Sequence, residues 1–281
     1  MSQQGIAANA QPAARPVSRA LTKVPEITIF FWVTKILTTA MGEVTSDFMN
    51  SALGPAIAVP LMLIGLVIAL KRQFKTPGYS AWNYWLVVVM VAVFGTSAAD
   101  ALHVGFGIPY TVSTSFYLVV LTAVFIAWYR SEKTLSIHSI YTPRREKFYW
   151  WTVLATFALG TAGGDMTATS FHIGYLASGI MFASIIALPA VAHRWFGLNS
   201  ILAFWFAYII TRPLGASFAD WLDATRHLGG LNLGQGPVAL GFAVVMLGFI
   251  AYLAATRIDV KQDHAVTAQP RPQPVLDVEL D

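Results

Sequence analysis

Hydrophobic stretches of about 20 residues recur along the whole chain and are separated by short polar segments. A stretch of that length spans the hydrocarbon core of a bilayer as an α-helix. Exposed backbone polar groups are not tolerated in lipid, and the alternating pattern of a barrel strand is absent, so helices are predicted. The pattern therefore predicts eight transmembrane helices and an all-α membrane protein. The spans are expected at residues 27–49, 54–70, 82–103, 108–129, 148–169, 173–192, 199–222 and 237–256.

The composition supports this class and excludes several others. Of the 281 residues, 56% are hydrophobic and only 11% are charged, whereas a soluble globular domain has roughly 25% charged residues. The absence of cysteine excludes disulfides, zinc–thiolate sites and thiol nucleophiles. The sequence also contains no phosphate-binding loop, dinucleotide fingerprint, GxSxG elbow or HExxH motif. We therefore expect no enzyme activity, and no cofactor apart from a divalent cation that the chain could bind.

The basic residues give the predicted orientation. Fifteen of the 18 Lys and Arg residues lie before the first span, after the last one or in the connections on that same side, and the opposite connections hold only Arg226. The positive-inside rule then places both termini in the cytoplasm of a bacterial inner membrane. The net charge of +4 reflects this distribution and does not indicate nucleic-acid binding. Two basic residues, Lys35 and Arg212, fall inside predicted spans.

The first helix of each predicted pair carries the same motif. It contains an aspartate that is preceded by a tryptophan 15 residues earlier, a glycine five residues earlier and a small residue one residue earlier. Coincidences at fixed offsets in four segments indicate internal duplication. The aspartates are Asp47, Asp100, Asp165 and Asp220, the tryptophans Trp32, Trp85, Trp150 and Trp205, and the glycines Gly42, Gly95, Gly160 and Gly215.

The motif divides the chain into four tandem two-helix repeats. Because each repeat has an even number of spans, all four have the same orientation, unlike the inverted repeats of many transporters. We expect them to pack about a pseudo-fourfold or nested twofold axis along the membrane normal, with the first helices lining the centre. The predicted units are a flexible cytoplasmic tail at 1–22, repeats at 23–79, 80–143, 144–196 and 197–257, and a second flexible cytoplasmic tail at 258–281.

The segments that carry the motif resemble the copies in a known bacterial family. They are EITIFFWVTKILTTAMGEVTSDF, WNYWLVVVMVAVFGTSAADALH, FYWWTVLATFALGTAGGDMTATSFH and ILAFWFAYIITRPLGASFADWLD. They are similar to the repeat of the bacterial membrane-protein family described as domain of unknown function 347, which has two transmembrane regions and a characteristic tryptophan per repeat. The resemblance covers about residues 23–257. It implies an integral bacterial membrane protein and brings no established catalytic residues.

The glycine and tryptophan of the motif are predicted to serve packing. The glycine and the small residue lie four apart and form a face that allows helices to approach closely in lipid. The tryptophan lies about 22 Å from its aspartate along the helix, at 1.5 Å per residue. We therefore expect the tryptophans to anchor near the cytoplasmic interface and the aspartates to lie toward the outer end.

Polar residues flank each aspartate on the same helical face and are the predicted binding residues. Residues four before, or three and seven after, the aspartate lie within about 60° of it on a helical wheel. Carboxylates inside a membrane cost about 2.5–3.5 kcal/mol each and usually mark an ion route or a proton relay. The structural alternative is hydration of each aspartate at the outer interface. Besides the four aspartates, the predicted binding residues are Glu43, Thr96, Thr161 and Asp223, with Lys35 and Arg212 as internal counter-ions.

The ligand types suggest which ion would bind. Oxygen and nitrogen ligands without thiolate suit a divalent cation such as Mn²⁺, or a site that binds only protons. Asp100 and His103 lie three residues apart, and Asp223 and His227 four apart, so that acid and imidazole share a helical face. The histidines predicted as metal ligands are His103, His172 and His227.

The preferred interpretation is a membrane transporter that moves a cation, either a divalent metal such as Mn²⁺ or a proton-coupled ion, through a central site lined by one aspartate per repeat. One alternative is a non-transporting scaffold or sensor whose polar residues only hold the helices together. Another is a small-organic-anion carrier that binds its solute with Lys35 and Arg212. The predicted partners are the lipid bilayer and a small cation or other small solute, without nucleic acid. The oligomeric state stays open.

Overall fold

The computed structural model describes residues 22–260. The predicted N-terminal tail at 1–22, except Thr22, and the predicted C-terminal tail at 258–281, except residues 258–260, lie outside the described residues. The described part is helical and contains no strand. Its long helices are α1 (Ile29–Leu53), α2 (Pro55–Lys75), α3 (Ala81–Asp100), α4 (Tyr110–Glu132), α5 (Pro143–Asp165), α6 (Tyr175–Ile185), α7 (Ala187–Phe196), α8 (Ser200–Asp223) and α9 (Gln235–Thr256). Short helical turns are η1 (Ala101–Gly105), η2 (Ile137–Ser139), η3 (Met166–Ser170) and η4 (Arg226–Leu228).

The local sequence explains where the second helix of each repeat begins. Gly54, Gly174 and Gly234 precede α2, α6 and α9 with φ values of 75°, 81° and 80°. Glycine adopts this left-handed region without the steric cost that a Cβ imposes, so the chain can reverse direction sharply. Pro109 precedes α4 instead, and its ring already fixes an extended start.

The span predicted at 173–192 consists of two consecutive helices instead of one continuous helix. α6 and α7 meet at Ile186, and together they cover Tyr175–Phe196. The sequence prediction missed this break, although Pro189 lies in the first turn of α7. Proline is tolerated in a first turn, because its missing N–H is not needed there. The third repeat therefore differs from the others, whose second helices are continuous.

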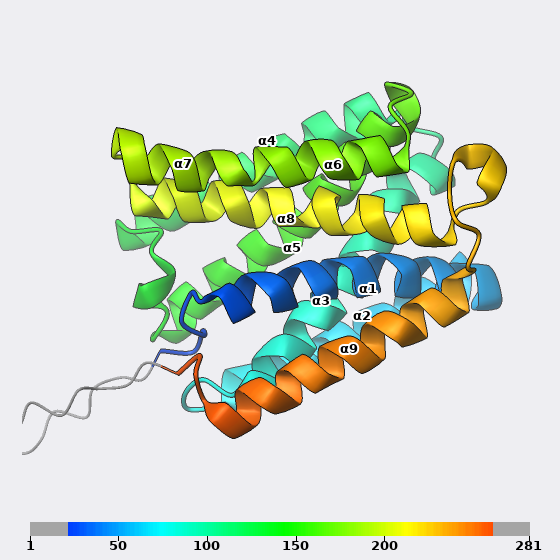
Figure 1. Cartoon of the computed structure of the whole chain (residues 1–281). Helices are drawn as coiled ribbons and strands as arrows, with labels where there is room; N and C mark the ends of the chain where they lie inside the picture. The colour runs from blue at the N-terminus through cyan, green and yellow to red at the C-terminus, as the bar shows by residue number, and fades with distance from the viewer. Residues whose placement is uncertain (1–21, 261–281) are drawn as a thin grey trace, which may run out of the picture.

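Four first helices form a closed inner ring in the order α1, α3, α5, α8 and back to α1. Each second helix packs mainly on the first helix of the next repeat: α2 on α3, α4 on α5, α6 with α7 on α8, and α9 on α1. Figure 1 shows α9 along the near side of α1, and α6 and α7 in line above α8. The expected central position of the first helices is confirmed. The cyclic order gives the bundle its pseudo-fourfold arrangement.

The glycines of the motif let the inner helices touch. A Cβ added to any of them would collide with a side chain of the next inner helix, so only hydrogen fits. The colliding residue always lies eight positions before the aspartate of its own repeat, and the fourth contact closes the circle. The contacts are Gly42 with Ala92, Gly95 with Phe157, Gly160 with Arg212, and Gly215 with Thr39.

Six helical segments are long and apolar enough to cross a membrane: α2, α3 continued by η1, α4, α6 with α7, α8 and α9. The inner helices α1 and α5 are not among these six. Both are comparatively polar, because α1 contains Lys35, Glu43 and Asp47 and α5 begins with a charged turn. The outer helices α2, α4 and α9 expose many large apolar side chains, as a lipid-facing surface requires. The chain is thus a multi-pass helical membrane protein.

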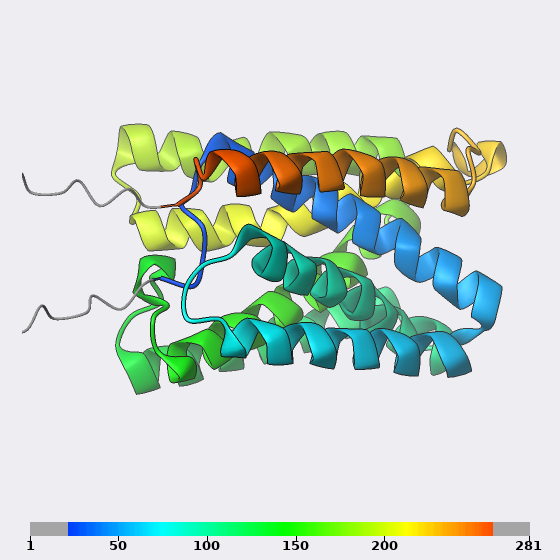
Figure 2. The ribbon, with the colours of Figure 1, turned by 90° about the horizontal axis from the view of Figure 1, so that it is seen from below.

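Both ends of the described chain lie at the same end of the bundle (Figure 2). Backbone hydrogen bonds tie them together there: Tyr79 donates to Thr22 over 3.0 Å, and Glu26 donates to Asp259 over 2.8 Å. The side chain of Lys23 also forms a buried ion pair of 2.7 Å with Glu146. This end, where the segment before α1 meets the segment after α9, is called the terminal end below. The aspartates lie toward the opposite end, called the aspartate end.

Candidate functional site

Residues spaced four apart along the inner helices form layers across the centre of the bundle. The layers follow from the repeat register, because equivalent residues of the four inner helices lie at the same depth. The outermost is the aspartate layer, Asp47, Asp100, Asp165 and Asp220; four residues earlier lies the middle layer, Glu43, Thr96, Thr161 and Ala216. Next come Thr39, Ala92, Phe157 and Arg212, then Lys35, Val88, Val153 and Tyr208, and finally the aromatic layer, Phe31, Tyr84, Tyr149 and Phe204.

Exposure changes sharply along this series of layers. The four aspartates are half-buried, whereas every residue in the four layers beneath them is buried. The centre is therefore accessible at the aspartate end and closed toward the terminal end. Asp100 and Asp165 each end an α-helix at the point where a π-helical turn, η1 or η3, begins. Such π-turns are frequent at functional sites.

Arg212 connects all four repeats at the middle layer. Its side chain, 0% exposed, donates through Nη2 to Glu43 of the first repeat and to Thr96 of the second. The hydroxyl of Thr161 in the third repeat lies 2.6 Å from the same nitrogen, and Nη1 donates to the carbonyl of Thr39 over 3.2 Å. The Thr96 hydroxyl also lies 3.0 Å from the Glu43 carboxylate. The fourth repeat offers no oxygen in this layer, because Ala216 stands at the equivalent position.

Three carboxylates form a compact group between α1 and α8. Oxygen atoms of Glu43, Asp47 and Asp220 lie within 4.8 Å of one another, a spacing that one metal ion can bridge. These three carboxylates therefore converge, and they belong to the first and fourth repeats.

Lys35 does not serve as a counter-ion in this conformation. Its amine is fully buried and has neither a hydrogen-bond partner nor an ion pair among the residues that the structure describes. Instead Nζ lies 4.1 Å from the ring centroid of Phe157 and 4.4 Å from that of Tyr208. The two predicted counter-ions thus differ, since Arg212 pairs with Glu43 and Lys35 contacts aromatic faces.

The aromatic layer closes the terminal end. The hydroxyl groups of Tyr84 and Tyr149 share a hydrogen bond across the bundle, and the rings of Phe31 and Phe204 lie 6.1 Å apart. The expected role of the tryptophans as interface anchors is wrong for three of them, because Trp85, Trp150 and Trp205 are at most 4% exposed. Trp85 and Trp150 pack edge-on against the preceding tyrosines, Tyr84 and Tyr149, and Trp205 packs edge-on against Trp128 of α4. Trp32 is half-buried.

The three histidines predicted as metal ligands lie outside the carboxylate group. His103 stacks on Tyr110, with ring centroids 3.6 Å apart, and its Nδ1 lies 2.8 Å from the carbonyl of Ile108. His172 is exposed in the connection before α6. His227 is exposed too, with Nε2 3.3 Å from the hydroxyl of Thr225. All three belong to connections at the aspartate end.

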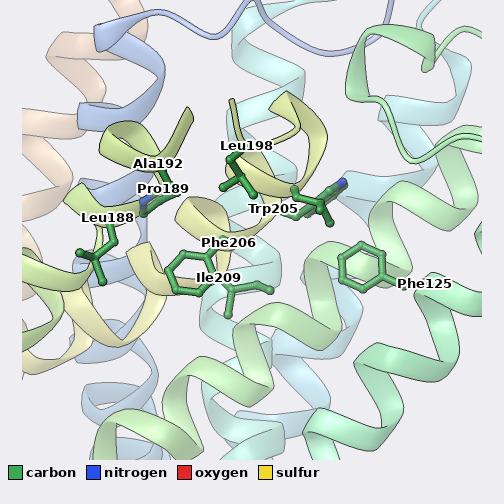
Figure 3. A pocket seen from close by; sticks show the side chains of 9 residues that line it. Phe125, Leu188, Pro189, Ala192, Leu198, Trp205, Phe206 and Ile209 are labelled. Carbon is green, nitrogen blue, oxygen red and sulfur yellow. The ribbon is translucent and has the colours of Figure 1, made fainter. Parts of the chain in front are cut away.

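A groove of about 500 Å³ lies away from this site, between α4, α7 and α8 (Figure 3). Its lining is apolar and includes Phe125, Pro189 and Trp205. It presents no charged side chain, so it does not suit an ion.

Sequence reasoning found the polar members of the site and missed its geometry. Thr39 and Phe157, which touch Arg212, were not predicted, although they lie at its equivalent positions in the other repeats. Aligning the repeats on the aspartate and comparing the position eight residues earlier could have revealed both residues. An alignment of the repeats does not, however, show which repeats lie next to one another in the bundle.

Comparison with known proteins agrees with this architecture. A family model described as Repeat of Unknown Function (DUF347) matches four segments, at residues 30–79, 83–134, 148–198 and 203–259. No curated protein and no solved structure matches the chain. The matched segments cover about three quarters of the sequence, and each contains one of the helix pairs described above. The chain therefore belongs to the family of Repeat of Unknown Function (DUF347) proteins.

Proposed function

We propose that this protein is a membrane transporter that moves a cation through the centre of the inner ring. The observation that carries the proposal is the compact group of Glu43, Asp47 and Asp220, together with the half-buried Asp100 and Asp165 of the aspartate layer. Carboxylates are costly inside a membrane, so their convergence favours an ion route. All eight spans, including α1 and α5, cross the membrane in this proposal.

The oxygen donors favour a hard or intermediate divalent cation such as Mn²⁺. Carboxylates and hydroxyl groups suit Mg²⁺, Ca²⁺ and Mn²⁺, and the chain has no thiolate that would select a softer metal. Transport would proceed by exchange: protonation lowers the negative charge of the carboxylates and releases the cation, and deprotonation restores the affinity. The histidines at the aspartate end would act only as ligands during entry.

The difference in solvent exposure between the half-buried aspartate layer and the buried aromatic layer supports a mechanism of alternating access. In the present conformation a cation reaches the aspartate layer from the aspartate end, and the aromatic layer blocks passage to the terminal end. Release on the other side requires the aromatic layer and the ion pair of Lys23 with Glu146 to separate. The basic connections support a cytoplasmic terminal end in a bacterial inner membrane, with both termini inside.

The test is flux of Mn²⁺ into proteoliposomes that contain the purified chain. Asp47→Asn and Asp220→Asn retain side-chain volume and remove the charge, so both are expected to abolish flux. Asp259→Asn, at the terminal end and outside the inner ring, is the matched control and should leave flux unchanged. Full flux in the Asp47 and Asp220 variants would refute a cation pathway through the aspartate layer.

A scaffold without transport activity is the second candidate. The observation that favours it is the bonding of Arg212, in the fourth repeat, to the other three repeats, which stabilises the bundle whether or not an ion passes. In that case the wild-type protein moves no Mn²⁺ at any gradient, and the aspartate variants change only thermal stability. A small-organic-anion carrier has less support, because both terminal nitrogens of Arg212 are already bound to protein oxygens.

A further inference from the structure

We propose that the middle layer is a second, deeper cation site, which Arg212 occupies in this conformation as a tethered substitute for the ion. The inference rests on the proposed transport function and assigns a ligand set and a gate to it. The ligands are the Glu43 carboxylate and the hydroxyl groups of Thr96 and Thr161, and the ligand class is a hard divalent cation.

The first argument is the shape of the oxygen cage. Nη2 of Arg212 contacts one oxygen from each of the first three repeats, Glu43, Thr96 and Thr161. A guanidinium nitrogen carries two N–H groups, so three acceptors exceed the two hydrogen bonds that it can donate. A spherical cation has no such limit and binds several oxygens at once. The cage is thus better matched to an ion than to the nitrogen that fills it.

The second argument is position along the path. The middle layer lies one helical turn beneath the aspartate layer, and Glu43 belongs to both the cage and the group formed with Asp47 and Asp220. A cation bound at the aspartates therefore already contacts one ligand of the deeper site. The guanidinium fills the deeper site in this conformation, and the fourth repeat supplies it from one layer below.

The third argument is the departure from repeat symmetry. Positions equivalent to Arg212 hold Thr39, Ala92 and Phe157, and the position in the fourth repeat that would complete the cage is Ala216. The fourth repeat thus contributes a cation in place of an oxygen. The ring centroid of Phe157 already lies 5.3 Å from the Arg212 guanidinium in this conformation, so an aromatic face supports this cation in addition to the cage oxygens.

The binding of Mn²⁺ and its flux can be compared in four purified proteins. Thr161→Val and Thr96→Val each remove one cage oxygen and leave the Arg212 and Glu43 side chains themselves in place. Thr156→Val is the matched control on the same helix as Thr161, because its buried hydroxyl bonds only to the carbonyl of Val153. Both cage variants are expected to keep Mn²⁺ binding at the aspartate layer while flux falls at least tenfold, and Thr156→Val should resemble wild type. Normal flux in both cage variants would overturn the deeper site.

Substitution of Arg212 provides a second, independent test of the deeper site. Arg212→Gln should raise the number of Mn²⁺ ions bound per chain from one to two, measured by equilibrium dialysis on protein that elutes as a single species. If this variant does not fold, Arg212→Lys is used, and weaker competition should then increase the affinity for Mn²⁺ several-fold. Unchanged stoichiometry and affinity in the folded variant would refute the role of Arg212. Absence of Mn²⁺ binding in the wild-type protein would instead refute the proposed function, so the two failures are distinguishable.

Discussion

The guanidinium of Arg212 in α8 forms a buried ion pair with the carboxylate of Glu43 in α1, across 169 residues of sequence. Removing one partner of a buried pair leaves an uncompensated charge and costs about 3–5 kcal/mol, whereas replacing both by apolar residues is often neutral. Glu43→Met and Arg212→Met are each expected to lower the unfolding temperature strongly, and the double variant should recover most of the loss. Tryptophan fluorescence during heating in detergent measures this cycle. Additive losses in the double variant would contradict a direct pair.

Substitution of Lys35 by methionine should not destabilise the protein, in contrast to substitution of Arg212. Its amine has no hydrogen-bond acceptor within residues 22–260, so Lys35→Met removes a buried polar group at no cost in the hydrogen bonds of this part of the chain. We expect the free energy of unfolding to stay unchanged or to rise by about 1 kcal/mol. The same fluorescence assay compares it with Arg212→Met. A loss comparable to that of Arg212→Met would show that Lys35 has an ionic partner.

Close packing of the inner helices predicts sensitivity at one glycine and tolerance at another. Gly215→Ala would place a Cβ against the Thr39 side chain and the backbone nitrogen of Ala40, so a loss of about 1–3 kcal/mol or more is expected. Gly241→Ala in α9 faces open space and should be neutral or stabilising by up to about 1 kcal/mol. Thermal unfolding of both variants tests the contrast. Equal stability of the two would show that α1 and α8 are less closely packed.

The four aspartates are not expected to be equivalent in ion binding. Asp47 and Asp220 share the compact group with Glu43, whereas Asp100 and Asp165 lie outside that group. Charge count at the ion sets affinity, so Asp47→Asn and Asp220→Asn should weaken Mn²⁺ binding on the order of tenfold more than Asp100→Asn and Asp165→Asn. Calorimetric titration of the four single variants gives the ranking. Equal losses would indicate a symmetrical site at the axis.

A pH effect is expected at the terminal end. Burial raises the pKa of Asp259 above its ordinary value, and the hydrogen bond from Tyr79 partly opposes this. A folded-state pKa above the unfolded one means that the folded protein binds the proton more tightly, so this contribution to stability is present at low pH and is lost as the pH rises through the folded pKa. The unfolding temperature of Asp259→Asn should therefore fall less than that of wild type between about pH 4 and about pH 8. Tyr79→Phe should enlarge the fall, and parallel curves for all three proteins would refute the assignment.

Local patterns in the sequence predicted much of the fold. Apolar stretches of bilayer length indicated the helices, because partition into lipid depends on each segment by itself. The offsets among Trp32, Gly42 and Asp47, repeated three more times, indicated the four repeats. The same reasoning selected Glu43 and Arg212 as members of the site. Nothing local, however, predicted the break at Ile186 or the burial of Trp85.

The sequence by itself therefore determined the membrane class, the repeat unit and the residue types that face the centre. Only the tertiary structure decided that the ring closes from α8 to α1, which brings Gly215 against Thr39 and Arg212 against Glu43. The physical reason is that hydropathy and helical periodicity act within one segment. Helix order depends instead on close contacts and buried charges contributed by segments far apart in the chain.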